Sequence, residues 1–200
     1  MPRLFSAVQL PPEVAARLSL LRAPIDGARW VPVENLHLTL RFFGDVEGRM
    51  AREIAAELED VAALPFELEI SGCGAFGGRL PTTIFASLKP SAELLALQRA
   101  HERVARTLGL PREQHAFHPH ITLARSRGTS PDAVARFLEA HGGFRLPAFT
   151  VDGFALLSSR PHTGGGPYAI EQSYPFLSTD FDETDEDQAA YAVAWDSRMP

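Results

Sequence analysis

The chain has 200 residues, of which 45% are apolar and 22% charged, a composition typical of a globular protein and unlike that of a disordered or membrane-spanning chain. Its single cysteine, Cys73, excludes an intrachain disulfide and favours a reducing compartment. The sequence shows no secretory signal and no apolar run of membrane-spanning length, so we expect a cytoplasmic protein.

The net charge of −6 comes from the C-terminal end of the chain. Residues 180–200 hold seven of the 25 acidic residues and one of the 19 basic residues, which leaves 18 of each elsewhere. A neutral body with a local basic cleft can bind a phosphate group, whereas an evenly acidic body would repel it. We therefore expect one domain over 1–178 and a solvated acidic extension over 179–200. Competition of this extension with a polyanion for the cleft is an alternative role.

Hydrophobic periodicity predicts strands and helices that follow one another along the chain. In chain order we expect a strand at 3–10, a helix at 11–25, a strand at 35–43, a helix at 46–64, strands at 66–76 and 82–89, a helix at 91–108, a strand at 119–125, a helix at 131–140, and strands at 148–158 and 167–176. The scheme restarts halfway along the chain. This indicates two α/β lobes related by a pseudo-twofold axis.

Two of the predicted strands carry the same polar pattern, "HLTL" at 37–40 and "HITL" at 120–123. Because side chains i and i+2 of a strand share a face, His37 lies beside Thr39, and His120 beside Thr122. The intervening leucine and isoleucine side chains point to the opposite face. If the two lobes face each other, the four polar side chains line one groove.

Two imidazoles at one site suit acid and base catalysis at neutral pH, because one can accept a proton while the other donates one. Threonine hydroxyls can donate to the non-bridging oxygens of a phosphoryl group. A cyclic phosphodiester fits this set well, since its strained ring carries its own leaving group. Arg125 would extend the anion site, but it has the opposite parity to His120. It reaches the groove only if the strand ends or bulges near Ala124.

Two other interpretations use the same residues. A histidine on a strand is often a structural side chain, so either motif alone would be weak evidence of function. His115, His118 and His120 could also bind zinc or iron through their imidazoles. That metal site would leave Pro119, the threonine and the whole first motif without a role, and no cysteine accompanies it.

The paired motifs resemble those of the two-histidine (2H) phosphoesterase superfamily. More narrowly, "RLFSAVQLPPEV", "NLHLTLRFFGDV" and "FHPHITLAR" resemble the RNA 2′,3′-cyclic phosphodiesterase family, also named 2′-5′ RNA ligases. The resemblance extends over about residues 3–176. It implies an α+β, bilobal fold in which two pseudo-symmetric lobes, each an antiparallel sheet with helices outside, enclose a central cleft. It further implies a reaction without metal or cofactor. A monomer is the default expectation for the oligomeric state.

The resemblance also implies roles for individual residues. His37 would protonate the departing 3′ oxygen, His120 would activate water, and Thr39, Thr122 and Arg125 would hold the phosphate. The product would be a 2′-phosphomonoester, and the substrate an RNA end or a cyclic nucleotide. The reverse, 2′-5′ ligating reaction would exchange the two histidine roles.

Two points stay open at the level of the sequence: which aromatic side chains stack on a base, and whether the protein turns its ligand over. Phe5 and Phe43 lie beside the motif strands and are candidates for base stacking, although both suit an apolar core equally well. The alternative function is a module of the same fold that binds nucleotides or RNA ends without turnover.

Overall fold

The computed structural model describes residues 3–159 and 168–177. In this part the elements, in chain order, are β1 (Arg3–Gln9), α1 (Pro12–Ser19), β2 (Ala28–Trp30), a 3-10 turn (Val33–Asn35), β3 (His37–Asp45), α2 (Gly48–Glu59), β4 (Phe66–Leu68), β5 (Ile70–Phe76), β6 (Thr83–Leu88), α3 (Ala92–Thr107), β7 (His120–Ser126), α4 (Pro131–His141), β8 (Phe149–Val151), β9 (Gly153–Ser159) and β10 (Tyr168–Pro175). The fold is α+β. The predicted extension at 179–200 lies outside the described residues.

The main sheet is antiparallel, with the strand order β10-β9-β1-β3-β7-β6-β5 and with β2 added to β7. Its two motif strands, β3 and β7, are neighbours, but they pair at one position only, Leu38 with Ile121. The two halves of the sheet therefore meet at the two His-x-Thr motifs, which this topology brings together.

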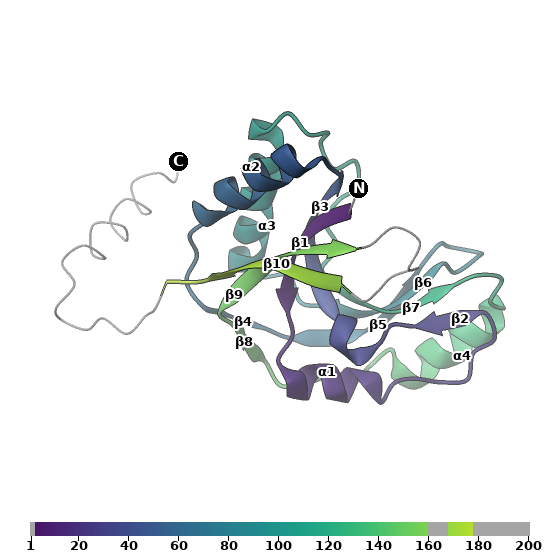
Figure 1. Ribbon diagram of the computed structural model, residues 1–200. Helices are drawn as coiled ribbons and strands as arrows, with labels where there is room; N and C mark the ends of the chain where they lie inside the picture. Colours follow the sequence, from purple (N-terminus) through teal and green to yellow (C-terminus); the bar gives the residue numbers. More distant parts are fainter. Residues whose placement is uncertain (1–2, 160–167, 178–200) are drawn as a thin grey trace.

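Helices cover the sheet through apolar stripes that the sequence pattern predicts. Helix α2 buries Ile54 and Leu58, and α3 buries Leu94 and Leu97. The N-terminus of α3 is capped by Ser91, whose hydroxyl accepts a hydrogen bond from the Leu94 amide at 3.1 Å. Figure 1 shows α2 and α3 on one side of the molecule and α1 and α4 at the opposite end.

Three details differ from the predicted elements. The expected strands at 66–76 and 148–158 are each divided, because β4 and β8 pair with each other in a small separate sheet while β5 and β9 join the main sheet. Two helices are shorter than predicted, because α1 ends at Ser19 and not at residue 25, and α2 ends at Glu59 and not at residue 64. Strand β2, which the sequence analysis missed, extends β7. Within the described residues, no helix is both long and apolar enough to cross a membrane.

Candidate active site

Each motif strand carries a β-bulge directly after its His-x-Thr sequence. In β3, Thr39 pairs with Ala7 and Arg41 with Ser6, so that Leu40 is the extra residue. In β7, Thr122 pairs with Phe85 and Ala124 with Ile84, so that Leu123 is the extra residue. A bulge reverses the alternation of side chains between the two faces. The side chain five positions after each histidine, Phe42 in β3 and Arg125 in β7, therefore lies on the same face as that histidine.

This reversal decides the position of Arg125, which the sequence analysis made conditional on a bulge near Ala124. Leu123 and Ala124 are both buried, and Arg125 is exposed on the face of His120 and Thr122. Its positive charge is one cause of the lowered pKa of both His37 and His120. The structure thus brings Arg125 close to both imidazoles.

Hydrogen bonds orient both imidazoles in the same way. Nδ1 of His37 donates to the Asn35 carbonyl at 2.8 Å, and Nδ1 of His120 donates to the His118 carbonyl at 2.7 Å. A carbonyl can only accept, so we assign the proton of each neutral ring to Nδ1. Nε2 is then the basic nitrogen of each ring. That of His37 lies 3.1 Å from Oγ1 of Thr39, whose hydroxyl donates to it.

Aromatic side chains surround both imidazoles. Phe5 and Tyr168 lie 5.0 and 5.2 Å from His37 between ring centroids, and Phe76 and Phe85 lie 4.9 and 5.4 Å from His120. Apolar surroundings disfavour a charged ring. Burial is accordingly the main reason that the pKa of His37 falls to about 4, and burial also lowers the pKa of His120. In the free protein at neutral pH both rings are therefore uncharged.

The two aromatic residues that were candidates for base stacking, Phe5 and Phe43, are both buried. Phe43 is 6% exposed and belongs to the main hydrophobic core, on the side away from the histidines. Phe5 is 2% exposed and lies in a second, smaller cluster with Ala7 and Tyr168. Burial argues against base stacking at either position. The bulge at Leu40 instead exposes Phe42, which is 46% exposed and lies 5.6 Å from Phe5 between ring centroids.

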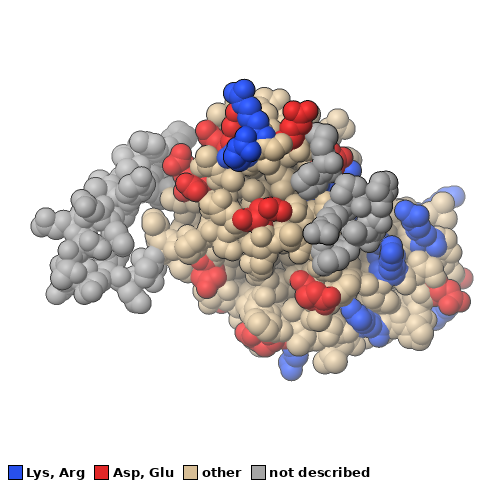
Figure 2. Space-filling model, viewed as in Figure 1, with Lys and Arg blue, Asp and Glu red and all other residues tan. Residues whose placement is uncertain are grey.

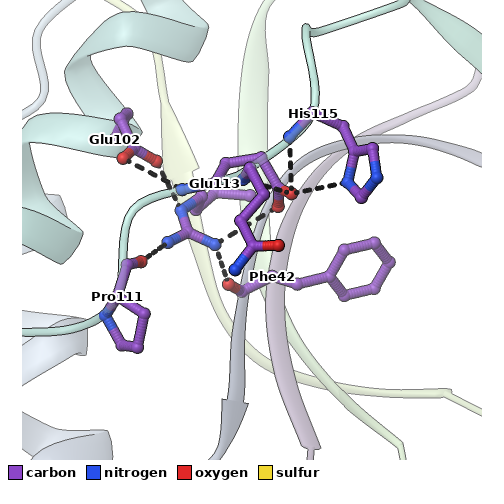
Figure 3. A network of polar contacts seen from close by, with 7 residues as sticks. Phe42, Glu102, Pro111, Glu113 and His115 are labelled. Atoms are coloured by element: carbon purple, nitrogen blue, oxygen red, sulfur yellow. Dashed lines mark hydrogen bonds and ion pairs between the residues drawn. The ribbon is translucent and has the colours of Figure 1, made fainter.

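A buried arginine supports this part of the site. Arg41 is 7% exposed, and its guanidinium contacts Glu102 of α3 at 2.6 Å, Glu113 at 3.6 Å, and the carbonyls of Phe42 and Pro111. Figure 3 shows these partners around the guanidinium, with the ring of Phe42 pointing away from the network. The network fastens the bulge of β3 to the segment that leads into His118 and His120.

The predicted metal-binding alternative finds no support in these positions. His115 is highly exposed and its Nδ1 lies 3.6 Å from the Glu113 carboxylate. His118 uses its carbonyl to orient His120. Among residues 3–159 and 168–177, no three His, Cys, Asp or Glu side chains come together as a group that could hold a metal ion.

A basic Nε2 on each of two neighbouring His-x-Thr strands, with an arginine close to both imidazoles, agrees with the paired motifs by which the sequence resembles two-histidine phosphoesterases. The chain belongs to the 2′-5′ RNA ligase superfamily, whose family model matches residues 10–163. A relative from Thermus thermophilus, an RNA 2′,3′-cyclic phosphodiesterase, is 32% identical over 183 residues, which are 86% of this chain and 89% of the relative. One from Archaeoglobus fulgidus with the same name is 29% identical over 161 residues, 78% and 90% of the two chains.

Solved structures share the fold over most of the chain. The crystal structure of TT0787 of Thermus thermophilus has a TM-score of 0.73 and 28% identity, and the match covers 87% of this chain and 97% of that one. Escherichia coli LigT complexed with 3′-AMP has a TM-score of 0.72 and 25% identity, with 89% and 100% covered. These matches confirm the α+β class predicted from the sequence.

Proposed function

We propose that this protein hydrolyses 2′,3′-cyclic phosphate ends of RNA or of nucleotides to 2′-phosphomonoesters. The observation that carries the proposal is the meeting of the two His-x-Thr motifs at the Leu38–Ile121 pair, with Arg125 beside both imidazoles. The names of the curated relatives support the same activity. The neighbouring motifs and their matching bulges also support two lobes related by a pseudo-twofold axis within one domain.

In the proposed reaction His120 removes a proton from water, and the water oxygen forms a new bond to phosphorus. The bond from phosphorus to the 3′ oxygen breaks, and His37 donates a proton to that oxygen. The products are a 2′-phosphomonoester and a free 3′ hydroxyl. Thr39, Thr122 and Arg125 hold the phosphoryl oxygens as their negative charge redistributes in the transition state. The reverse reaction, with the histidine roles exchanged, would give a 2′-5′ linkage.

Substrate binding would help to assemble the site, because it would change the protonation state of His37. In the free protein this ring is neutral, because burial lowers its pKa to about 4. A bound phosphodiester is an anion, and an opposite charge nearby raises the pKa of an imidazole. Once Nε2 of His37 carries a proton it no longer accepts from Thr39, whose hydroxyl is then free to donate to a phosphate oxygen. Binding would thus prepare both the acid and an oxyanion donor.

The direct test is hydrolysis of 2′,3′-cyclic AMP in the presence of a chelator. We expect turnover in the wild type and a loss of at least 100-fold in kcat for His37→Ala and for His120→Ala, the size typical of one proton-transfer group. His115→Ala is the matched control, because it removes an exposed imidazole of the alternative metal triad.

Other outcomes of this assay would favour other functions. Tight nucleotide binding by a wild type without turnover would support the binding module in place of the enzyme. Turnover that the chelator abolishes would contradict the two-histidine mechanism, and its loss in His115→Ala would support the metal triad. Equal activity of His37→Ala and the wild type would refute the acid role.

A further inference from the structure

Three arginines lie on the outer part of the two strands next to the proposed site. Arg125 lies near the end of β7, Arg127 directly follows the last residue of that strand, Ser126, and Arg29 on β2 is the cross-strand partner of Arg125. All three are exposed. Figure 2 shows Lys and Arg side chains gathered over the end of the molecule that carries β2, β6 and β7 in Figure 1.

The backbone fixes these arginines relative to the two histidines. The bulge at Leu123 places Arg125 on the face of His120, and Arg127 follows two positions later with Ser126 buried between them. Arg127 lies one residue beyond the end of β7. The Val31 amide donates to the Leu123 carbonyl at 2.8 Å, and the Arg127 amide donates to the Gly27 carbonyl at 2.9 Å. Strand β2 is therefore hydrogen-bonded to β7 on both sides of Arg29.

The charges of these side chains favour an anion between them. Arg29 and Arg125 are directly opposed residues of an antiparallel pair, so their side chains share one face. Within the described residues Arg125 and Arg127 form no ion pair with an acidic side chain. A phosphate group can accept two parallel hydrogen bonds from one guanidinium through two of its oxygens, and its negative charge strengthens these bonds.

We propose that Arg29 and Arg127 bind the phosphodiester that precedes the terminal nucleotide of an RNA substrate. The inference rests on the proposed function, in which Arg125 and the two motifs hold the reacting cyclic phosphate. The next phosphate of an RNA chain lies one nucleotide away. Arg127 lies two residues after Arg125, just past the end of β7, and Arg29 lies opposite Arg125 on β2. A cyclic mononucleotide has no such phosphate. This subsite therefore distinguishes an RNA end from a free cyclic nucleotide.

The test compares kcat/KM for a short oligoribonucleotide with a 2′,3′-cyclic phosphate end and for 2′,3′-cyclic AMP. We expect the ratio of the two values, RNA over mononucleotide, to fall about tenfold in Arg29→Gln and in Arg127→Gln, the size of one lost charge-assisted hydrogen bond. The dependence of log KM for RNA on log salt concentration should become shallower by about 0.7 for each lost phosphate contact. Arg52→Gln, which removes an exposed arginine from α2, is the control and should keep the wild-type ratio.

Binding of the product separates this inference from the proposed function. The dissociation constants of the same oligoribonucleotide ending in a 2′-phosphate and of 2′-AMP are measured for each variant. If the wild type turns over neither substrate, the proposed function fails, and the ratio of the two dissociation constants still decides whether the subsite exists. The subsite is refuted if Arg29→Gln and Arg127→Gln keep the wild-type ratios of kcat/KM and of the dissociation constants. This holds both when the affinities for the two ligands are unchanged and when they weaken equally.

Discussion

His101 should make the folded protein sensitive to acid, although it takes no part in the proposed reaction. It lies in α3 with a side chain that is 0% exposed, and its ring meets that of Phe154 edge to face at 4.4 Å. Neither ring nitrogen has a hydrogen-bond partner among the described residues. Burial lowers its pKa from 6.5 to about 3.

The sign of the effect follows from proton binding in the two states. Below pH 6.5 the unfolded chain binds a proton at this imidazole and the folded protein does not, so stability falls as the pH falls towards about 3. Each pH unit corresponds to about 1.4 kcal/mol. His101 should therefore lower the free energy of unfolding by about 2 kcal/mol between pH 7 and pH 5.

Substitution of His101 by leucine tests this magnitude. His101→Leu keeps a side chain of similar volume and removes two buried, unpaired nitrogens, so it should stabilise the protein by about 1 kcal/mol at pH 7. Urea denaturation at pH 7 and pH 5 should show this advantage growing by about 2 kcal/mol. His115→Leu is the matched control for the loss of an imidazole at an exposed position. An advantage of His101→Leu that is the same at both pH values would refute the reasoning.

Three further predictions concern the site itself. A bound phosphate raises the pKa of the proposed acid, His37. In pH–rate profiles, the alkaline limb of kcat should therefore lie at higher pH than the alkaline limb of kcat/KM. Alkaline limbs at the same pH would contradict protonation of His37 on substrate binding. Phe42→Ala should raise KM for 2′,3′-cyclic AMP about tenfold with little change in kcat if this exposed ring stacks on the base, whereas an unchanged KM would exclude that role. Glu102→Gln leaves the charge of Arg41 buried and should destabilise the protein by about 3 kcal/mol in urea denaturation. Glu113→Gln, which changes the more exposed partner of Arg41, should lower the free energy of unfolding by under about 1 kcal/mol. Equal losses of stability in Glu102→Gln and Glu113→Gln would contradict the inference that burial makes the Glu102 contact the more important one.

Most elements of the fold could be predicted from periodicity, because each buries one apolar face. The divisions at Glu69 and Asp152 could not, since β4 and β8 continue the apolar pattern of β5 and β9 and differ from them only in their pairing partners. Strand β2 is three residues long, too short to show an alternation. Long-range pairing, which leaves no periodic signal in one sequence, accounts for these differences.

The site shows the same division between local and long-range information. The common face of His37 and Thr39 follows from the geometry of a strand and needs no tertiary structure. The bulges at Leu40 and Leu123 depend on register with β1 and β6, so parity alone could not place Arg125 or reveal Phe42. The second motif did contain one indication of its bulge. Arg125 has the opposite parity to His120 in a regular strand, so it could share the face of His120 only if a bulge lay between them.

The single pairing of Leu38 with Ile121 also sets an order of events during folding. The two residues are 83 positions apart, and closing a loop of that length costs roughly 4 kcal/mol of chain entropy. Contacts at such separation form slowly compared with a local hairpin. Strand β1 must in addition pair with β9, at the far end of the described chain. A growing chain that ends before β7 can hold the β1–β3 strand pair, but it has only one of the two imidazoles.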